Sequence, residues 1–150
     1  MRKEDGVFEP EERLFRALNP AAFHEECLVP SNLPATNVSV DREKYGGSAS
    51  SVLKPIERNG WGTLVWLAGS VPKEFSRSDG SPLAIAPEDS PLEENEAHAE
   101  LRVRRQDESR KIMDEGDLRT KALKQIKHEI RMHLAQIAVD VVPPSIRIQE

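Results

Sequence analysis

The chain has 150 residues, with 26 acidic against 21 basic side chains and a formal net charge of -5 at pH 7. This length suits one domain with a real core, and the acidic balance argues against nucleic-acid binding over the whole surface. The single cysteine, Cys27, excludes an intramolecular disulfide, and no apolar run is long enough to span a bilayer. We expect a soluble cytoplasmic protein that uses no cofactor.

The N-terminal residues 1–12 are charged and include a glycine and a proline, which predicts a flexible arm. We expect a single domain over residues 13–142 and a C-terminal tail over residues 143–150. Within the domain, Arg13–Leu18 predicts a short strand, because Asn19-Pro20 stops any helix there.

Several shorter segments follow. The alternation in Asn37–Asp41 predicts a second strand. A serine cap predicts a short helix over residues 48–57, which Pro55 shortens or splits. Lys73–Pro82 is polar and predicts a hairpin loop. Pro82–Pro87 is apolar between two prolines, which predicts an edge strand.

The run Gly62–Val71 is the most apolar part of the chain and predicts a strand. Side chains that alternate along a strand point to opposite faces of the sheet. Both sets are mainly apolar here: Thr63, Val65 and Leu67 on one face, and Leu64, Trp66 and Ala68 on the other. We therefore expect both faces of this strand to be covered.

After an acidic loop over Glu88–Glu96, the stretch Asn95–Arg104 has the cleanest two-residue alternation. One face carries Ala97, Ala99, Leu101 and Val103, and the other carries His98, Glu100, Arg102 and Arg104. This pattern predicts a strand. The charged residues 106–116 that follow suit either a helix or a disordered bridge.

The final segment predicts a helix over Leu118–Val139, capped by Asp117 and ended by Pro143-Pro144. Its apolar stripe consists of Leu123, Ile126, Ile130, Leu134, Ile137 and Val141. The expected class is α+β: a small mixed or antiparallel sheet with a long C-terminal amphipathic helix on one face. The short helix after Ser48, or a second copy of the chain, would cover the other face.

The polar face of the Asn95–Arg104 strand is a candidate catalytic site, formed by His98, Glu100 and Arg102 with Arg16 from an earlier strand. A histidine beside a glutamate can exchange protons near neutral pH, and flanking arginines can hold an anion. A solvated sheet face has the same pattern, so both interpretations stay open.

Arg16, Ser39 and a glutamate in a late strand resemble, in their order, the ADP-ribosyl-transferring and NAD-cleaving folds. That resemblance implies that the arginine holds a dinucleotide phosphate, the serine supports the site and the glutamate stabilises charge at the ribose. The usual Ser-Thr-Ser is Val-Ser-Val here, and the aromatics that would sandwich nicotinamide are not evident.

The last helix also has a basic flank, which forms a candidate binding surface of Lys121, Lys124, Lys127 and Arg131. These side chains can meet phosphates, a partner or the chain's own acids. No aromatic residues interleave them, so a partner surface or a solvated flank is favoured over nucleic acid. His24 and Cys27 form half of a zinc site without a second pair, so no metal is expected.

Three short stretches resemble landmarks of a group of small bacterial proteins of unassigned activity. They are Leu14-Phe15-Arg16, Ser39-Val40-Asp41-Arg42 and the Asn95–Glu100 stretch. The similarity would span residues 13–142. It implies a compact bacterial cytoplasmic protein that works beside a partner and carries no transferable catalytic residues.

Three functions follow from the sequence. The favoured one is a non-enzymatic protein-binding or accessory subunit of a bacterial complex, for example in a defence or toxin–antitoxin context. Its partner would be another chain or a second copy, because a chain poor in aromatics gains from burying apolar surface against another chain. The alternatives are a small nucleotide-directed enzyme that uses the His/Glu/Arg face, and an accessory protein that binds nucleic acid.

Overall fold

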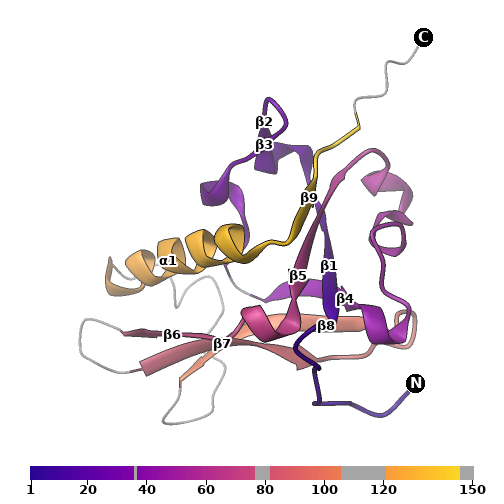
Figure 1. The fold of residues 1–150 in the computed structure, drawn as a ribbon, viewed down its shortest axis with the longest axis horizontal. Helices are drawn as coiled ribbons and strands as arrows, with labels where there is room; N and C mark the ends of the chain where they lie inside the picture. The colour runs from indigo at the N-terminus through magenta and orange to yellow at the C-terminus, as the bar shows by residue number, and fades with distance from the viewer. Residues whose placement is uncertain (36, 77–81, 106–120, 146–150) are drawn as a thin grey trace.

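The structure is a computed structural model that describes residues 1–35, 37–76, 82–105 and 121–145. Its main feature is a seven-stranded antiparallel sheet in the order β6-β7-β8-β4-β1-β5-β9. Along the chain its strands are β1 (Arg13–Leu18), β4 (Val38–Arg42), β5 (Gly62–Leu67), β6 (Lys73–Ser76), β7 (Pro82–Asp89), β8 (His98–Arg105) and β9 (Asp140–Val142). With one helix, α1 (Lys121–Ile137), and a small hairpin of β2 (Phe23–His24) and β3 (Cys27–Leu28), the described chain is α+β (Figure 1).

Strand β5 is covered on both faces, as the apolar pattern predicts. Leu64 and Trp66 are fully buried, in one cluster with apolar side chains of α1, and the Trp66 indole donates a hydrogen bond of 2.8 Å to the Leu134 carbonyl. On the opposite face, Val65 packs with Phe15 and Val52 in a second cluster. The strand is shorter than predicted, because a 3₁₀ turn begins at Ala68.

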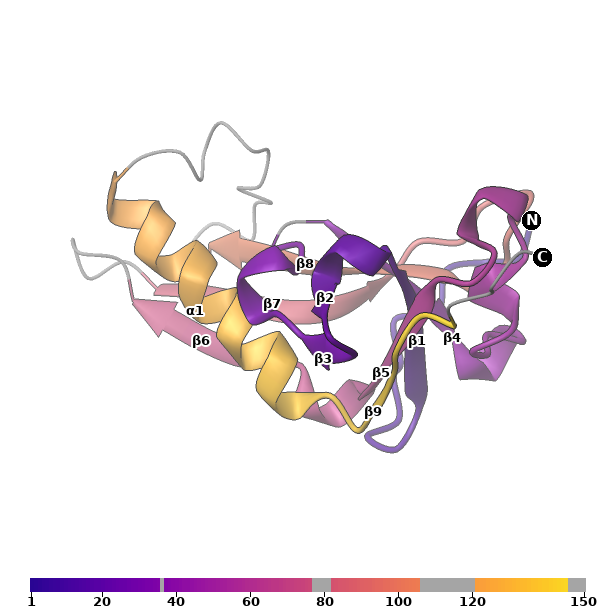
Figure 2. The ribbon, with the colours of Figure 1, turned by 90° about the horizontal axis from the view of Figure 1, so that it is seen from above.

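The segment that covers the second face runs from β4 to β5. Two of its three 3₁₀ turns, Ser51–Leu53 and Ile56–Arg58, replace the predicted helix, and Pro55 separates them. The Ser48 hydroxyl accepts a hydrogen bond from the Ser51 amide at 3.0 Å, but the first 3₁₀ turn begins after Ser50 and not after Ser48 as predicted. In both views this segment lies on the side of β1 and β5 away from α1 (Figures 1 and 2).

Two predictions about the strands were wrong. Pro82–Pro87 belongs to an inner strand, β7, which pairs with β8 on one side and with β6 on the other. β6 itself lies in a segment predicted as loop. The prolines are tolerated because Pro82 begins the strand, and β6 ends its pairing at Ile85, before it reaches Pro87.

The predicted end of the last helix was also wrong. α1 ends at Ile137, and Val141, assigned to its apolar stripe, lies in β9 and pairs with Leu64. Without β9, the outer edge of β5 would leave its backbone groups unpaired. The Val139 amide donates to the Val65 carbonyl at 2.9 Å, and the pairing of β9 with β5 begins at the next residue. The predicted start of the helix at Asp117 and Leu118, and residues 106–116, lie outside the described residues. No helix in the described ranges is long and apolar enough to cross a membrane.

The N-terminal arm is attached to the sheet through Arg42, whose side chain is fully buried at the end of β4. Its guanidinium donates two hydrogen bonds of 2.9 Å to the Glu12 carboxylate and one of 3.1 Å to Asp89. Further bonds go to the carbonyls of Asp5 and Val7. The flexibility predicted for residues 1–12 stays a prediction, and no local pattern predicted these contacts.

The arm also contacts Tyr45, three residues after Arg42. The Tyr45 hydroxyl donates a hydrogen bond of 2.6 Å to Asp5, and the Arg2 guanidinium stacks 3.6 Å from the centre of the Tyr45 ring. Arg2 also holds Asp89 through two hydrogen bonds of 2.7 Å. The position of Tyr45 is therefore set by the arm.

We expect acid to destabilise this arrangement. Burial raises the pKa of Asp89, but hydrogen bonds from Arg2, the Asp5 amide and Arg42 outweigh it and lower the pKa from 3.8 to about 2. A carboxylate with a lowered folded-state pKa stabilises the fold above its unfolded pKa, and this contribution is lost as the pH falls from about 4 towards 2. Urea unfolding of the wild type should show this loss, and Asp89→Asn should show a flatter pH dependence in that range. Parallel curves for the two proteins would contradict it.

Candidate anion-binding site

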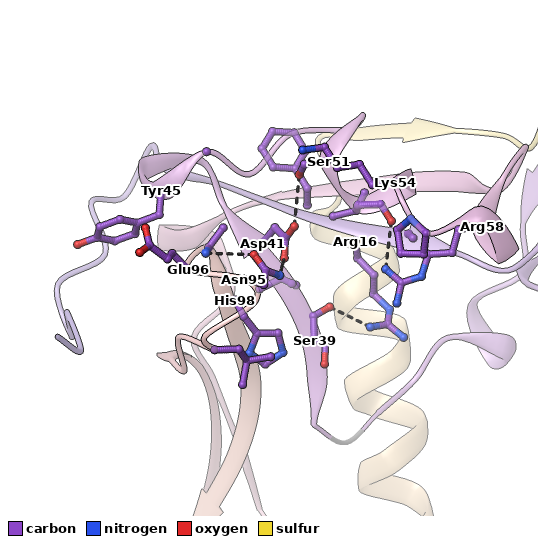
Figure 3. A pocket seen from close by; sticks show the side chains of 18 of the residues that line it. Arg16, Ser39, Asp41, Tyr45, Ser51, Lys54, Arg58, Asn95, Glu96 and His98 are labelled. Atoms are coloured by element: carbon purple, nitrogen blue, oxygen red, sulfur yellow. Dashed lines mark hydrogen bonds between the residues drawn. The ribbon is translucent and has the colours of Figure 1, made fainter. Parts of the chain in front are cut away.

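A pocket of about 770 Å³ opens on the sheet face away from α1. Its floor comes from β1 and β4, one wall from the segment of 3₁₀ turns, and another from the turn that precedes β8 (Figure 3). This volume is in the range of pockets that hold small organic ligands. The chemistry of the pocket depends on the charged side chains at its two ends.

Arg16 forms the innermost part of the cationic end. It is mostly buried, and one of its terminal nitrogens donates a hydrogen bond of 2.9 Å to the Ser39 carbonyl. Its Nε is buried without a hydrogen-bond partner among the described residues. Burial, and second the nearby charge of Arg58, lower the pKa of Arg16 from 12.5 to about 10. The protein thus holds a guanidinium where its charge is poorly compensated.

Two further cations stand at the same end. Arg58 lies close enough to repel the charge of Arg16, and it donates a hydrogen bond of 3.1 Å to the Val52 carbonyl. The exposed Lys54 lines the rim (Figure 3). Among the described residues, no carboxylate lies within 4.0 Å of any of these three cations. Two guanidiniums and an ammonium without a carboxylate are the donor set that an anion requires.

The middle of the pocket is polar and ordered by hydrogen bonds. The Asn95 side-chain amide donates to the Asp41 carboxylate at 2.8 Å. The other carboxylate oxygen lies 3.3 Å from the Ser51 hydroxyl, which shares its one proton between this oxygen and the Ser48 carbonyl at 3.0 Å. His98 lies beyond them (Figure 3). Its Nδ1 lies 2.7 Å from the Ser90 carbonyl, which places the proton on Nδ1 because a carbonyl only accepts. Nε2 is thus the ring nitrogen left for a ligand.

The structure separates the four predicted catalytic residues. Arg16 and His98 line the pocket, while Glu100 and Arg102 do not. Arg102 donates to Glu100 at 2.7 Å and lies 3.5 Å from Glu88, which also accepts from Arg104. The Arg104 hydrogen bond, partly opposed by burial, lowers the pKa of Glu88. The predicted strand alternation is confirmed in β8, but Glu100 is engaged in an ion-pair row and not with His98.

The predicted basic flank is not a single open surface in the part of α1 that the structure describes. Arg131 donates a hydrogen bond of 2.6 Å to the Leu33 carbonyl, so it fastens α1 to the segment between β3 and β4. Lys124 is exposed and Lys127 is partly buried. The side chain of Lys121 lies outside the described residues. Binding of a partner by this flank stays a prediction.

Sequence reasoning missed Lys54, Arg58 and Asp41 as site residues. A signal was present, because Lys54 and Arg58 flank Pro55 in a segment without a clear helical pattern. Short turns around a proline often carry functional side chains. Their meeting with Arg16 depends on how this segment folds back over β1, which no local pattern reveals.

We also searched the described residues for a metal site and compared the chain with known proteins. No group of three or more His, Cys, Asp or Glu side chains in the described ranges is placed to hold a metal ion. The exposed Cys27 and His24 lie on the β2–β3 hairpin, outside the pocket. Comparison with protein-family models, curated proteins and solved structures found no match to this chain.

Proposed function

We propose that this protein binds a small anionic molecule, one that carries a phosphate group, in the pocket between β1, β4 and the segment of 3₁₀ turns. The observation that supports this most is Arg16, a mostly buried guanidinium with an unsatisfied Nε and a second arginine beside it. A buried donor without a partner costs about 1–3 kcal/mol, and more when it is charged. A bound anion beside the guanidinium would compensate the charge of Arg16 and reduce its repulsion with Arg58.

A phosphate suits this end better than a carboxylate. A phosphate monoester presents three oxygens and about two negative charges, and arginine binds it with two parallel N–H donors. Arg16, Arg58 and Lys54 together offer three positive charges. A single carboxylate would compensate only one of them.

The proposal is tested by calorimetric titration of butyl phosphate into the purified protein. Arg16→Met keeps the length of the side chain and removes its charge, and we expect it to weaken binding about 10-fold to 100-fold, the size of a charged hydrogen bond. Arg58→Met should weaken binding in the same direction. Arg102→Met is the matched control, because Arg102 is paired outside the pocket and its loss should leave the affinity unchanged. Equal affinity of the Arg16→Met variant and the wild type would refute the proposal.

The enzymatic alternative has weaker support. Arg16 contacts only the backbone carbonyl of Ser39, and Glu100 is paired with Arg102 away from the pocket. We therefore propose binding without assigning a reaction.

The role of an accessory subunit, and a cytoplasmic location, stay predictions. One observation favours contact with another chain: the edge strand β9 and the residue before it expose two apolar side chains, Val139 and Val142. An exposed sheet edge can pair with a further strand. Measurement of the mass in solution tests this, and a strict monomer that captures no partner would count against it.

A further inference from the structure

The pocket is larger than its cationic end requires. Its volume of about 770 Å³ is in the range that holds a whole small organic ligand, so a phosphate group at Arg16 fills only a part of it. The rest of the ligand must lie along the floor towards Asp41, Asn95 and His98 (Figure 3). The chemistry of that second end therefore decides which phosphorylated compounds fit.

The second end is acidic. Asp41 lies on the floor, and the exposed Glu94 and Glu96 lie at the rim on the same side. No described basic side chain forms an ion pair with any of these three carboxylates. The pocket thus has uncompensated positive charge at one end and uncompensated negative charge at the other.

The Asp41 carboxylate has room for a ligand. It accepts hydrogen bonds from Asn95 and Ser51, one on each oxygen. An ionised carboxylate offers about four acceptor positions, so about two remain. Because the two protein donors fix the carboxylate in place, a ligand group meets an already ordered acceptor.

The two ends are a short distance apart. Arg16 is bound to the carbonyl of Ser39, and Asp41 is two residues further along the same strand. Residues two apart in an antiparallel strand are separated by about 7 Å. A ligand that reaches both ends needs about four or five bonds between its phosphate and its donor group.

We propose that the ligand is a bipolar phosphate ester, with its phosphate at Arg16 and Arg58 and a primary amine, as an ammonium group, at Asp41. This inference rests on the proposed function and specifies the class of its ligand. An ammonium suits this end better than a hydroxyl because its charge and its three donors match the acidic side chains. The arrangement also selects against simple alkyl phosphates and against free amines, since each leaves one charged end of the pocket empty.

The test compares 4-aminobutyl phosphate with butyl phosphate, which differ only in the terminal amine. Calorimetric titration of the wild type should give about tenfold tighter binding of the amine, the order expected for one partly solvated charged hydrogen bond. Asp41→Asn should remove this preference, so that the two compounds bind the variant with equal affinity. Glu43→Gln is the matched control, because Glu43 is exposed and does not line the pocket, and it should retain the preference.

The outcomes separate this inference from the proposed function. If butyl phosphate binds through Arg16 and the amine adds nothing or weakens binding, the inference is overturned and the proposed function stands. If neither compound binds, both are overturned. Because the wild type alone gives the comparison of the two ligands, a failure of Asp41→Asn to fold does not prevent a decision. A preference that persists in folded Asp41→Asn also overturns the assignment of the amine to Asp41.

Discussion

Replacing Arg42 by methionine is expected to lower the free energy of unfolding by about 3–5 kcal/mol, because it leaves buried carboxylates without their cation. Arg42 is fully buried and donates to Glu12, to Asp89 and to two carbonyls of the arm. Its guanidinium also stacks 3.8 Å from the centre of the Phe8 ring. Methionine keeps much of the volume of arginine but offers no donor. Urea unfolding followed by circular dichroism measures the loss.

The control for this change is Arg13→Met, since Arg13 is exposed on the neighbouring strand. A surface substitution of this kind usually stays within about 0.5 kcal/mol. If the two variants have the same stability, the arm is not held by Arg42. A second readout is the accessibility of the arm: limited proteolysis within residues 1–12 should become faster in Arg42→Met and not in Arg13→Met.

Truncating Ile130 to alanine is expected to cost about 2–5 kcal/mol, which is typical of a large-to-small change in a core. Ile130 is fully buried, and it belongs to the same cluster as Leu64 and Trp66 of β5. The cost arises because the removed methyl groups leave a cavity that the sheet cannot close. This variant tests directly whether α1 covers the sheet through its apolar stripe.

Met132 provides the matched control two residues along α1. Its side chain is 45% exposed, so Met132→Ala removes little buried surface, and alanine is the best helix former. We expect a change in the unfolding free energy below about 0.5 kcal/mol. If Met132→Ala lowered the free energy of unfolding more than Ile130→Ala, the buried face of the helix would be the one that carries Met132, which would contradict this packing.

Much of the fold follows from periodicity. The two-residue alternation of β8 and the doubly apolar run of β5 predicted both strands, because burial on one or both faces leaves a direct pattern in the sequence. The position of β7 within the sheet did not follow, since Pro82 and Pro87 favour an edge. They are tolerated inside because Pro82 begins β7 and the pairing with β6 ends at Ile85, before Pro87. The pairing of β9 with β5 was also missed, because a contact between Val141 and Leu64 depends on distant segments.

The candidate site was predicted only where its residues lie on strands with a clear two-residue alternation. Arg16 and His98 stood out as charged residues on predicted strands, and both line the pocket. Glu100 and Arg102 have the same local pattern as His98, but the pocket stops before them and they pair with each other. Arg58 was missed, because its place beside Arg16 depends on a turn that folds back over β1, and the proline in its segment indicates only a turn.

Arg16 is proposed to bind the anion, and its own Nε–H group can report this. The test is a nitrogen–proton correlation spectrum of the arginine side chains, recorded while butyl phosphate is added, with the Arg16 signal assigned from its absence in Arg16→Met. We predict a saturable shift of the Arg16 Nε–H signal, because an anion beside the guanidinium changes the charge around this group. Little change is expected at Arg102, which is paired with Glu100 outside the pocket. An Arg16 signal that stays fixed while the phosphate is raised well above millimolar concentration would contradict the account.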